Sequence, residues 1–205
     1  MTEIKRYEVL NSLPTYGPIY IPVSENDEPF YSEGFPVRFY KPDGTDWVAN
    51  FRLGWTGLNK VFEFNGHDKI IVVAGGLGYI MTPEKEKPLS TFGLTINEIF
   101  QTDNGSLVCA DGISILILDN LTGELWSSER ISWDGFQNLE LNDNIISGQA
   151  FDPTNSINEW SAFFLNIKTK ELIGGSYREF TKFNPEIPKV ILEDENKIRP
   201  WWKIF

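Results

Sequence analysis

The feature that most constrains this chain is an internal repeat of strand-like segments. Residues 96–108 hold a strand pattern, a polar turn at Asp103-Asn104-Gly105 and a second strand pattern, and residues 136–146 repeat that order around another Asp-Asn pair. Each stretch is followed by a third and a fourth apolar segment. These lie within residues 113–126 after the first stretch and within 162–173 after the second. Because β-branched and aromatic residues dominate these segments and turn residues separate them, each stretch predicts a run of antiparallel strands.

The register of the two copies supports the repeat. Leu107 aligns with Ile145 at an offset of 38 residues. Three later pairs share an offset of 47: Leu118 with Leu165, Thr122 with Thr169, and Glu124 with Glu171. The increase fits one insertion around residues 152–159. A fainter copy starts at Val61, where Ile70 precedes Leu107 by 37 residues. A period near 40 with four strands per unit is typical of a β-propeller blade.

The segment Leu118–Trp126 resembles the repeat of quinoprotein-type β-propellers, in which a strand, an Asp, a turn, Thr-Gly and a Trp follow one another. The second copy is degenerate, since Lys170 replaces the Gly and Ile173 the Trp. The resemblance implies repeat geometry and no particular activity. We therefore predict an all-β protein with little helix, built of antiparallel β-meander repeats. Two arrangements remain open, a small four-bladed ring and an open arc.

The expected organisation is a single domain spanning residues 1–205. Its N-terminal segment, 1–60, contains a β-hairpin, because Pro42-Asp43-Gly44 separates two alternating apolar runs and suits a tight turn. The propeller-like repeats occupy 61–178, and a polar C-terminal tail occupies 179–205.

The charge restricts the partners. With 18 Lys and Arg against 29 Asp and Glu, the formal net charge is −11. Nucleic acids and anionic membrane surfaces are bound through clustered basic residues, so the sequence predicts neither as a partner. A basic protein partner fits this charge, and so does an acidic composition that serves solubility alone. The N-terminus lacks the apolar stretch of a signal peptide and no apolar run could span a bilayer, so we expect a soluble cytoplasmic protein.

Catalytic motifs are not evident. Cys109 is the single cysteine and sits in a strand pattern, so we predict a core residue rather than a nucleophile. His67 is the single histidine and falls in a predicted turn. We expect no catalytic residue, no metal site and no cofactor. Gly75, Gly76 and Gly78 follow a strand but lack the residues of a phosphate loop, and predict a bulge or a close approach of strands.

Aromatic residues supply the candidate binding surface. Tryptophans beside Gly, Asp or a loop can anchor a peptide, a sugar or another chain, and they can also pack between neighbouring units. The candidate binding residues are Trp55, Trp133, Asp134, Trp160, Trp201 and Trp202.

Three functions fit these features. The first is a non-enzymatic β-repeat scaffold that binds a protein partner. The sequence also resembles small acidic bacterial proteins, some of them immunity proteins, which implies a basic toxin as the partner. The second is a carbohydrate-active or carbohydrate-binding β protein, which would need two converging carboxylates or an aromatic cleft. The third is a structural homodimer assembled through the aromatic tail.

Overall fold

The computed structural model describes residues 5–16, 19–64, 68–154 and 159–177. Over these residues the fold is all-β, as the sequence predicted, with 16 strands and no helix. The strands form four sheets of four strands each, which we number 1 to 4 in chain order.

Sheet 1 contains the predicted hairpin. It consists of β1 (Tyr7–Val9), β2 (Ile21–Val23), β3 (Phe35–Tyr40) and β4 (Asp46–Phe51). Val37 pairs with Ala49 and Phe39 with Trp47 across the turn, where Gly44 has a φ of 87°. The strand order is β1-β3-β4-β2, and β2 runs parallel to β4. Sheet 1 therefore departs from the antiparallel meander expected for the repeats.

Sheets 2, 3 and 4 are antiparallel meanders in which consecutive strands are neighbours. Sheet 2 contains β5 (Lys60–Phe64), β6 (Lys69–Ala74), β7 (Leu77–Met81) and β8 (Ser90–Phe92). Sheet 3 contains β9 (Ile96–Gln101), β10 (Leu107–Asp111), β11 (Ser114–Leu118) and β12 (Leu125–Ser127). Sheet 4 contains β13 (Phe136–Asn142), β14 (Ile145–Asp152), β15 (Glu159–Asn166) and β16 (Leu172–Gly174).

The later part of the predicted register is correct, and the earlier part is wrong by one residue. Leu107 pairs with Leu118, whereas Leu165 pairs with Ile146 rather than with Ile145. The residue equivalent to Leu107 is thus Ile146, at an offset of 39. A slip of one residue moves a side chain to the opposite face of a sheet. Leu107 and Ile146 are fully buried, whereas Ile145 is 36% exposed.

The two copies of the repeat share one turn. After β11, the carboxylate of Asp119 accepts hydrogen bonds from the backbone N–H groups of Leu121 and Thr122, each at 2.8 Å. After β15, the side-chain oxygen of Asn166 accepts the same pair of bonds from the second and third residues that follow it. Gly123 has a φ of 70°, and its equivalent Lys170 has a φ of 67°. The degenerate copy therefore keeps the turn geometry without the glycine.

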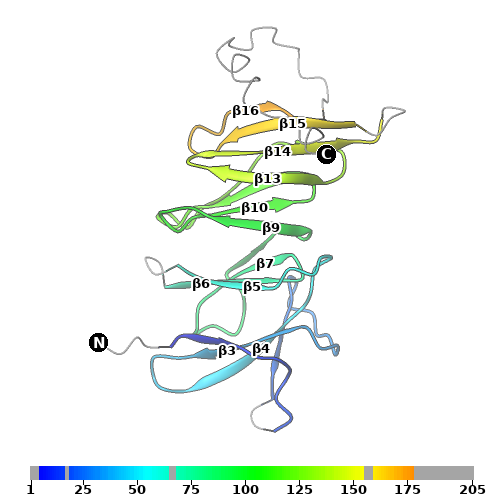
Figure 1. The fold of residues 1–205 in the computed structure, drawn as a ribbon. Coiled ribbons are helices and arrows are strands. Elements are labelled where there is room, and N and C mark those ends of the chain that lie inside the picture. Colours follow the sequence, from blue (N-terminus) through cyan, green and yellow to red (C-terminus); the bar gives the residue numbers. More distant parts are fainter. Residues whose placement is uncertain (1–4, 17–18, 65–67, 155–158, 178–205) are drawn as a thin grey trace, which may run out of the picture.

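The sheets stack face to face in chain order, so that they follow one another along the long axis of the molecule (Figure 1). One core cluster joins sheets 1 and 2, with Phe39, Phe51 and Tyr79 among its members. A second cluster joins sheets 2 and 3, and a third joins sheets 3 and 4. Within the described ranges no core cluster joins sheet 4 to sheet 1, and no closed ring is seen.

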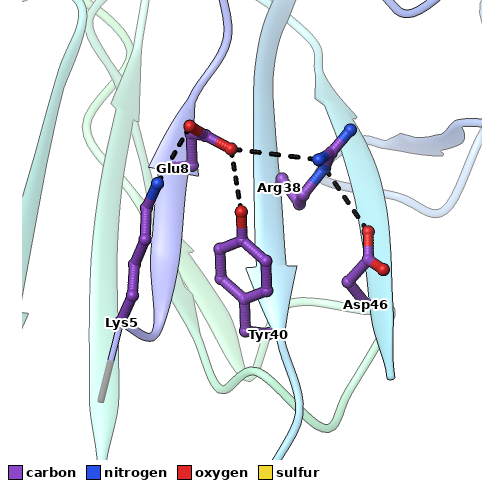
Figure 2. Close-up of polar contacts among 5 residues, drawn as sticks. All are labelled: Lys5, Glu8, Arg38, Tyr40 and Asp46. Carbon is purple, nitrogen blue, oxygen red and sulfur yellow. Dashed lines mark hydrogen bonds and ion pairs between the residues drawn. The ribbon is translucent and has the colours of Figure 1, made fainter. Parts of the chain in front are cut away.

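The outer face of sheet 1 is covered by polar contacts and by other parts of the chain. Figure 2 shows the carboxylate of Glu8 on β1 accepting hydrogen bonds from Lys5 and from the Tyr40 hydroxyl, at 2.9 and 2.8 Å. Arg38 on β3 lies between Glu8 and Asp46, with its Nε 3.4 Å from the Asp46 carboxylate. These residues form a charged layer over the end of the stack.

Candidate functional site

One edge of the stack collects the connections between sheets. In a four-stranded meander, the entering linker, the turn between the second and third strands and the leaving linker all lie at the same strand ends. We call this edge the linker face and define it by the following residues: 52–59, 74–76, 93–95, 111–113, 128–135, 151–152 and 174–177.

Backbone hydrogen bonds connect the linker face along the stack. The N–H groups of Gly54 and Thr56 bind the carbonyls of Ala74 and Gly75, at 2.9 and 2.8 Å. The next linker donates from Ile96 to Gly76, at 3.1 Å. Further along, Ile131 donates to Ile113, and Ser176 donates to Ile131, each at 2.9 Å. Backbone hydrogen bonds therefore connect the linkers to the turns and to one another, so the face is not a set of independent loops.

Polar side chains reinforce these contacts. The carboxylate of Asp111 accepts hydrogen bonds from the N–H groups of Leu94 and Thr95 and from the Thr95 hydroxyl, at 2.8 to 3.2 Å. Asn59 accepts one from the N–H of Gly75 at 2.7 Å. Each of these two side chains ties a linker to a turn of the sheet that the linker enters.

Glycines permit the close approach on this face. Gly76 has a φ of 85°, and a Cβ there would lie 2.6 Å from the carbonyl oxygen of Ile96. A Cβ on Gly54 would lie 2.5 Å from the carbonyl oxygen of Leu94. A Cβ on Gly78, inside β7, would overlap the ring of Phe92. The close approach predicted for the Gly75–Gly78 stretch is therefore observed.

Trp55 is the most exposed of the candidate tryptophans that the structure describes. It lies on the linker into sheet 2, and 78% of its surface is accessible. Its backbone N–H binds the carbonyl of Leu94 at 3.1 Å, which fixes the residue while the ring remains in solvent. Leu53, two residues earlier, is 44% exposed. An apolar ring on a fixed backbone is a suitable anchor for a partner.

Trp133 and Asp134 lie on the linker into sheet 4, where Trp133 is half-buried and Asp134 is exposed. The Trp133 ring packs edge-on against Tyr177, with ring centroids 4.6 Å apart. The guanidinium of Arg130 lies 4.3 Å from the Tyr177 ring centre and 5.2 Å from that of Trp133. Arg130 also donates to the carbonyls of Ser132 and Trp133, at 3.0 and 2.8 Å. Trp133 is thus part of an internally bonded cation–π cluster.

Trp160 lies at the start of β15, on the outer face of sheet 4 rather than on the linkers. It is 38% exposed and packs against Phe151, with ring centroids 5.0 Å apart. Trp201 and Trp202 fall outside the described residues, as does His67. The structure thus brings Trp55, Trp133 and Asp134 to one face and places Trp160 near its end.

Arg130 and Tyr177 belong to this face but were not among the predicted residues. Arg130 shows no pattern of its own in the sequence. Tyr177 could have been found, because it follows Ser176 as Trp133 follows Ser132, and both serines donate a hydrogen bond to the carbonyl of Phe151, at 2.6 and 3.3 Å. The shared Ser-aromatic pair at the end of two consecutive repeats was the available signal.

Cys109 lies in the core of the protein. Cys109 is fully buried, as predicted, and burial raises the pKa of its thiol to about 12. A raised pKa disfavours the thiolate, which is the form needed for nucleophilic attack. Over the residues that the structure describes, no group of three or more His, Cys, Asp and Glu side chains is placed to hold a metal ion. In the same residues no helix has the length and apolar character needed to cross a membrane.

No protein-family model matches the chain, and no curated protein matches its sequence.

Proposed function

We propose that the protein is a non-enzymatic scaffold, an open arc of propeller-like β units, that binds a basic protein through its linker face. The observation that carries the proposal is Trp55, a large apolar side chain that is 78% exposed on a backbone held by hydrogen bonds. Aromatic anchors of this kind contribute most of the binding energy in many protein interfaces. A fixed backbone also lowers the entropy that binding would cost.

The extent of the face favours a macromolecule over a small ligand. Trp55 lies on the linker into sheet 2, and Asp134 lies on the linker into sheet 4. Stacked sheets are about 10 Å apart, so two sheet spacings place these residues about 20 Å from each other. A protein interface of standard size, about 800 Å² per partner, can cover both. A sugar unit can contact one of them.

The charge of residues 1–177 favours a basic partner. Residues 1–177 contain 12 Lys and Arg against 24 Asp and Glu. A negative field of this kind accelerates association with a positively charged protein and repels acidic ones. The resemblance to acidic immunity proteins agrees with such a partner and suggests a basic secreted toxin, for example a nuclease.

The test uses three full-length proteins: wild type, Trp55→Ala and Leu121→Ala. Leu121 is 69% exposed in the turn after β11, at the opposite strand ends, and is the matched control. Each protein is immobilised and exposed to extract of the source organism, and the captured protein is then purified and titrated by calorimetry. We expect one-to-one binding that weakens as salt increases. Trp55→Ala should weaken it about 30-fold, the effect of removing a hot-spot residue worth about 2 kcal/mol.

Two results would contradict the proposal. One is a partner whose affinity falls equally with Leu121→Ala and Trp55→Ala, because binding would not depend on the linker face. The other is saturable quenching of tryptophan fluorescence by soluble oligosaccharides in wild type but not in Trp55→Ala. That outcome would favour the carbohydrate-binding alternative, in which Trp55 stacks on a sugar.

A further inference from the structure

The last sheet keeps only half of the apolar surface that its predecessors use for stacking. In sheets 2 and 3, one row of paired residues crosses the sheet on the side that faces the next sheet, and sheet 4 has an equivalent row on its outer face. In sheet 2 the row is Phe62, Ile71, Ile80 and Ser90, which is polar only on the edge strand β8. In sheet 3 it is Phe100, Val108, Ile117 and Trp126. In sheet 4 it is Glu140, Ser147, Phe164 and Ile173. The sheet 4 row is therefore polar on β13 and β14 and apolar on β15 and β16.

The apolar half extends along β15. Ala162 and Trp160 lie two and four residues before Phe164 on this strand, so all three share the outer face, opposite the buried Phe163 and Leu165. Phe151, which packs against Trp160, continues the surface onto the end of β14. In sheet 3, the equivalents of Phe164 and Ile173 are Ile117 and Trp126, which are covered by the following sheet. An exposed apolar strip of this kind is stabilised when another segment or chain packs on it, whereas the polar half is compatible with solvent.

The chain leaves sheet 4 in the way in which it entered it. Before sheet 4, the N–H groups of Ile131 and Ser132 both bind the carbonyl of Ile113, at 2.9 and 3.2 Å. After sheet 4, the N–H groups of Ser176 and Tyr177 both bind the carbonyl of Ile131, at 2.9 and 3.0 Å. The first crossing leads into β13, which packs on the preceding sheet. The second crossing is therefore aimed at the outer face of sheet 4.

The composition of residues 178–205, which follow sheet 4 in the sequence, suits packing on this outer face. Residues 178–205 hold six Lys and Arg against five Asp and Glu, whereas the rest of the chain is strongly acidic. The segment contains the apolar run Val190-Ile191-Leu192, and Lys203 separates Trp202 from Ile204 near its end. About six extended residues span 20 Å, so this segment has enough residues to cross a sheet. We propose that residues 178–205 cover the apolar half of sheet 4, over β15 and β16, within the same molecule.

Cysteine accessibility in the full-length chain tests this proposal. Native Cys109 is buried and does not compete for a thiol reagent. Ala162→Cys places a thiol on the apolar half, and Glu140→Cys places one on the polar half of the same face. We expect Ala162→Cys to react with dithiodipyridine at least ten times more slowly than Glu140→Cys. Adding Val190→Asp and Leu192→Asp to Ala162→Cys should restore a rate within about twofold of the control.

Three outcomes would overturn the proposal. Equal rates at Ala162→Cys and Glu140→Cys would show that the apolar half is uncovered. Slow reaction at Ala162→Cys that persists with Val190→Asp and Leu192→Asp would show that this segment is not the cover. Protection that increases as protein concentration rises from 1 to 100 µM, about the range of ordinary dimerisation constants, would show that a second copy occupies the face. The proposal does not depend on the partner of the linker face, and these rates are measured without any partner.

Discussion

The two ends of the stack expose different kinds of surface. The outer face of sheet 1 holds Val48 and Asn50, which are 1% and 0% exposed although no further sheet lies beyond them. Charged and hydroxyl groups complete that face (Figure 2). The outer face of sheet 4 holds Phe164 and Ile173, both half-buried, beside Trp160, which is 38% exposed. The outer face of sheet 1 is therefore covered by residues that the structure describes, whereas the outer face of sheet 4 keeps part of an apolar stacking surface.

The difference follows from how each sheet departs from the repeat. Sheet 1 replaces the meander by the order β1-β3-β4-β2, and its β2–β3 connection contacts Asn50 on the outer face. The carbonyl of Ser32 and the N–H of Gly34, both in this connection, bind the side chain of Asn50, at 3.0 and 2.8 Å. Sheet 4 keeps the repeat topology, and in its outer row polar side chains replace apolar ones on β13 and β14. Terminal units of repeat proteins need a solvent-compatible outer face, and these sheets achieve it to different degrees.

A charge introduced on the outer face of each end sheet should reveal the largest difference in stability between the two ends. Val48→Asp would bury a carboxylate on the outer face of sheet 1 and should lower the free energy of unfolding by about 3–5 kcal/mol. Ser147→Asp, on the polar half of the sheet 4 face, should cost less than about 1 kcal/mol. Urea unfolding followed by tryptophan fluorescence measures both. A loss as large for Ser147→Asp as for Val48→Asp would show that the whole sheet 4 face is buried.

Amide side chains allow a finer comparison. Asn50→Ala leaves the N–H of Gly34 and the carbonyl of Ser32 without their partner and should destabilise the protein by about 2–3 kcal/mol. Gln149→Ala, on the outer face of sheet 4, removes a half-buried acceptor that binds Gln137 at 2.7 Å and should cost about 0.5–1 kcal/mol. Equal losses in chemical denaturation would mean that the two faces are equally covered.

The smallest effect is expected from the charged layer of sheet 1. Hydrogen bonds from Lys5 and then from Tyr40 lower the pKa of the Glu8 carboxyl below its ordinary value of 4.5. This stabilisation is present above the unfolded-state pKa and is lost as the pH falls through the lower folded value. Tyr40→Phe should therefore destabilise less than Asn50→Ala at pH 7, and the difference from wild type should shrink as the pH falls through the lowered folded-state pKa of Glu8. A difference that is unchanged between pH 7 and pH 3 would exclude the carboxylate as its cause.

The sequence predicted the fold class and the later register because the apolar pattern and the turn residues agree there. Asp119 and Asn166 occupy equivalent turns, although Lys170 stands where the first copy has Gly123. The early register was wrong because Ile145 and Ile146 are both apolar, so alternation does not say which of them faces the core. Sheet 1 was predicted only as a hairpin, since β1 and β2 are three residues each and pair with distant strands.

The candidate site was predicted in part for the same kind of reason. Tryptophans beside Gly and Asp drew attention to the linkers, and Trp55 and Trp133 lie on them. Whether a ring is exposed or packed depends on contacts distant in sequence, such as that of Trp133 with Tyr177. The linker face itself depends on backbone bonds between residues about 20 positions apart, such as Gly54 with Ala74, which leave no side-chain pattern.

Amide hydrogen exchange of the full-length protein tests the hydrogen bonding of the linker face most directly. The N–H groups of Thr56, Gly76, Ile96 and Gly135 bind backbone carbonyls between linkers and turns. If these bonds hold the stack together, the opening free energies of the Ile96 and Gly135 N–H groups should come within about 1 kcal/mol of those for the core strands β6 and β10. These two groups bind the carbonyls of Gly76 and Gly112 on the preceding sheet, so they open only when the sheets separate. Exchange at the rate of exposed loops, while β6 and β10 stay protected, would contradict the account.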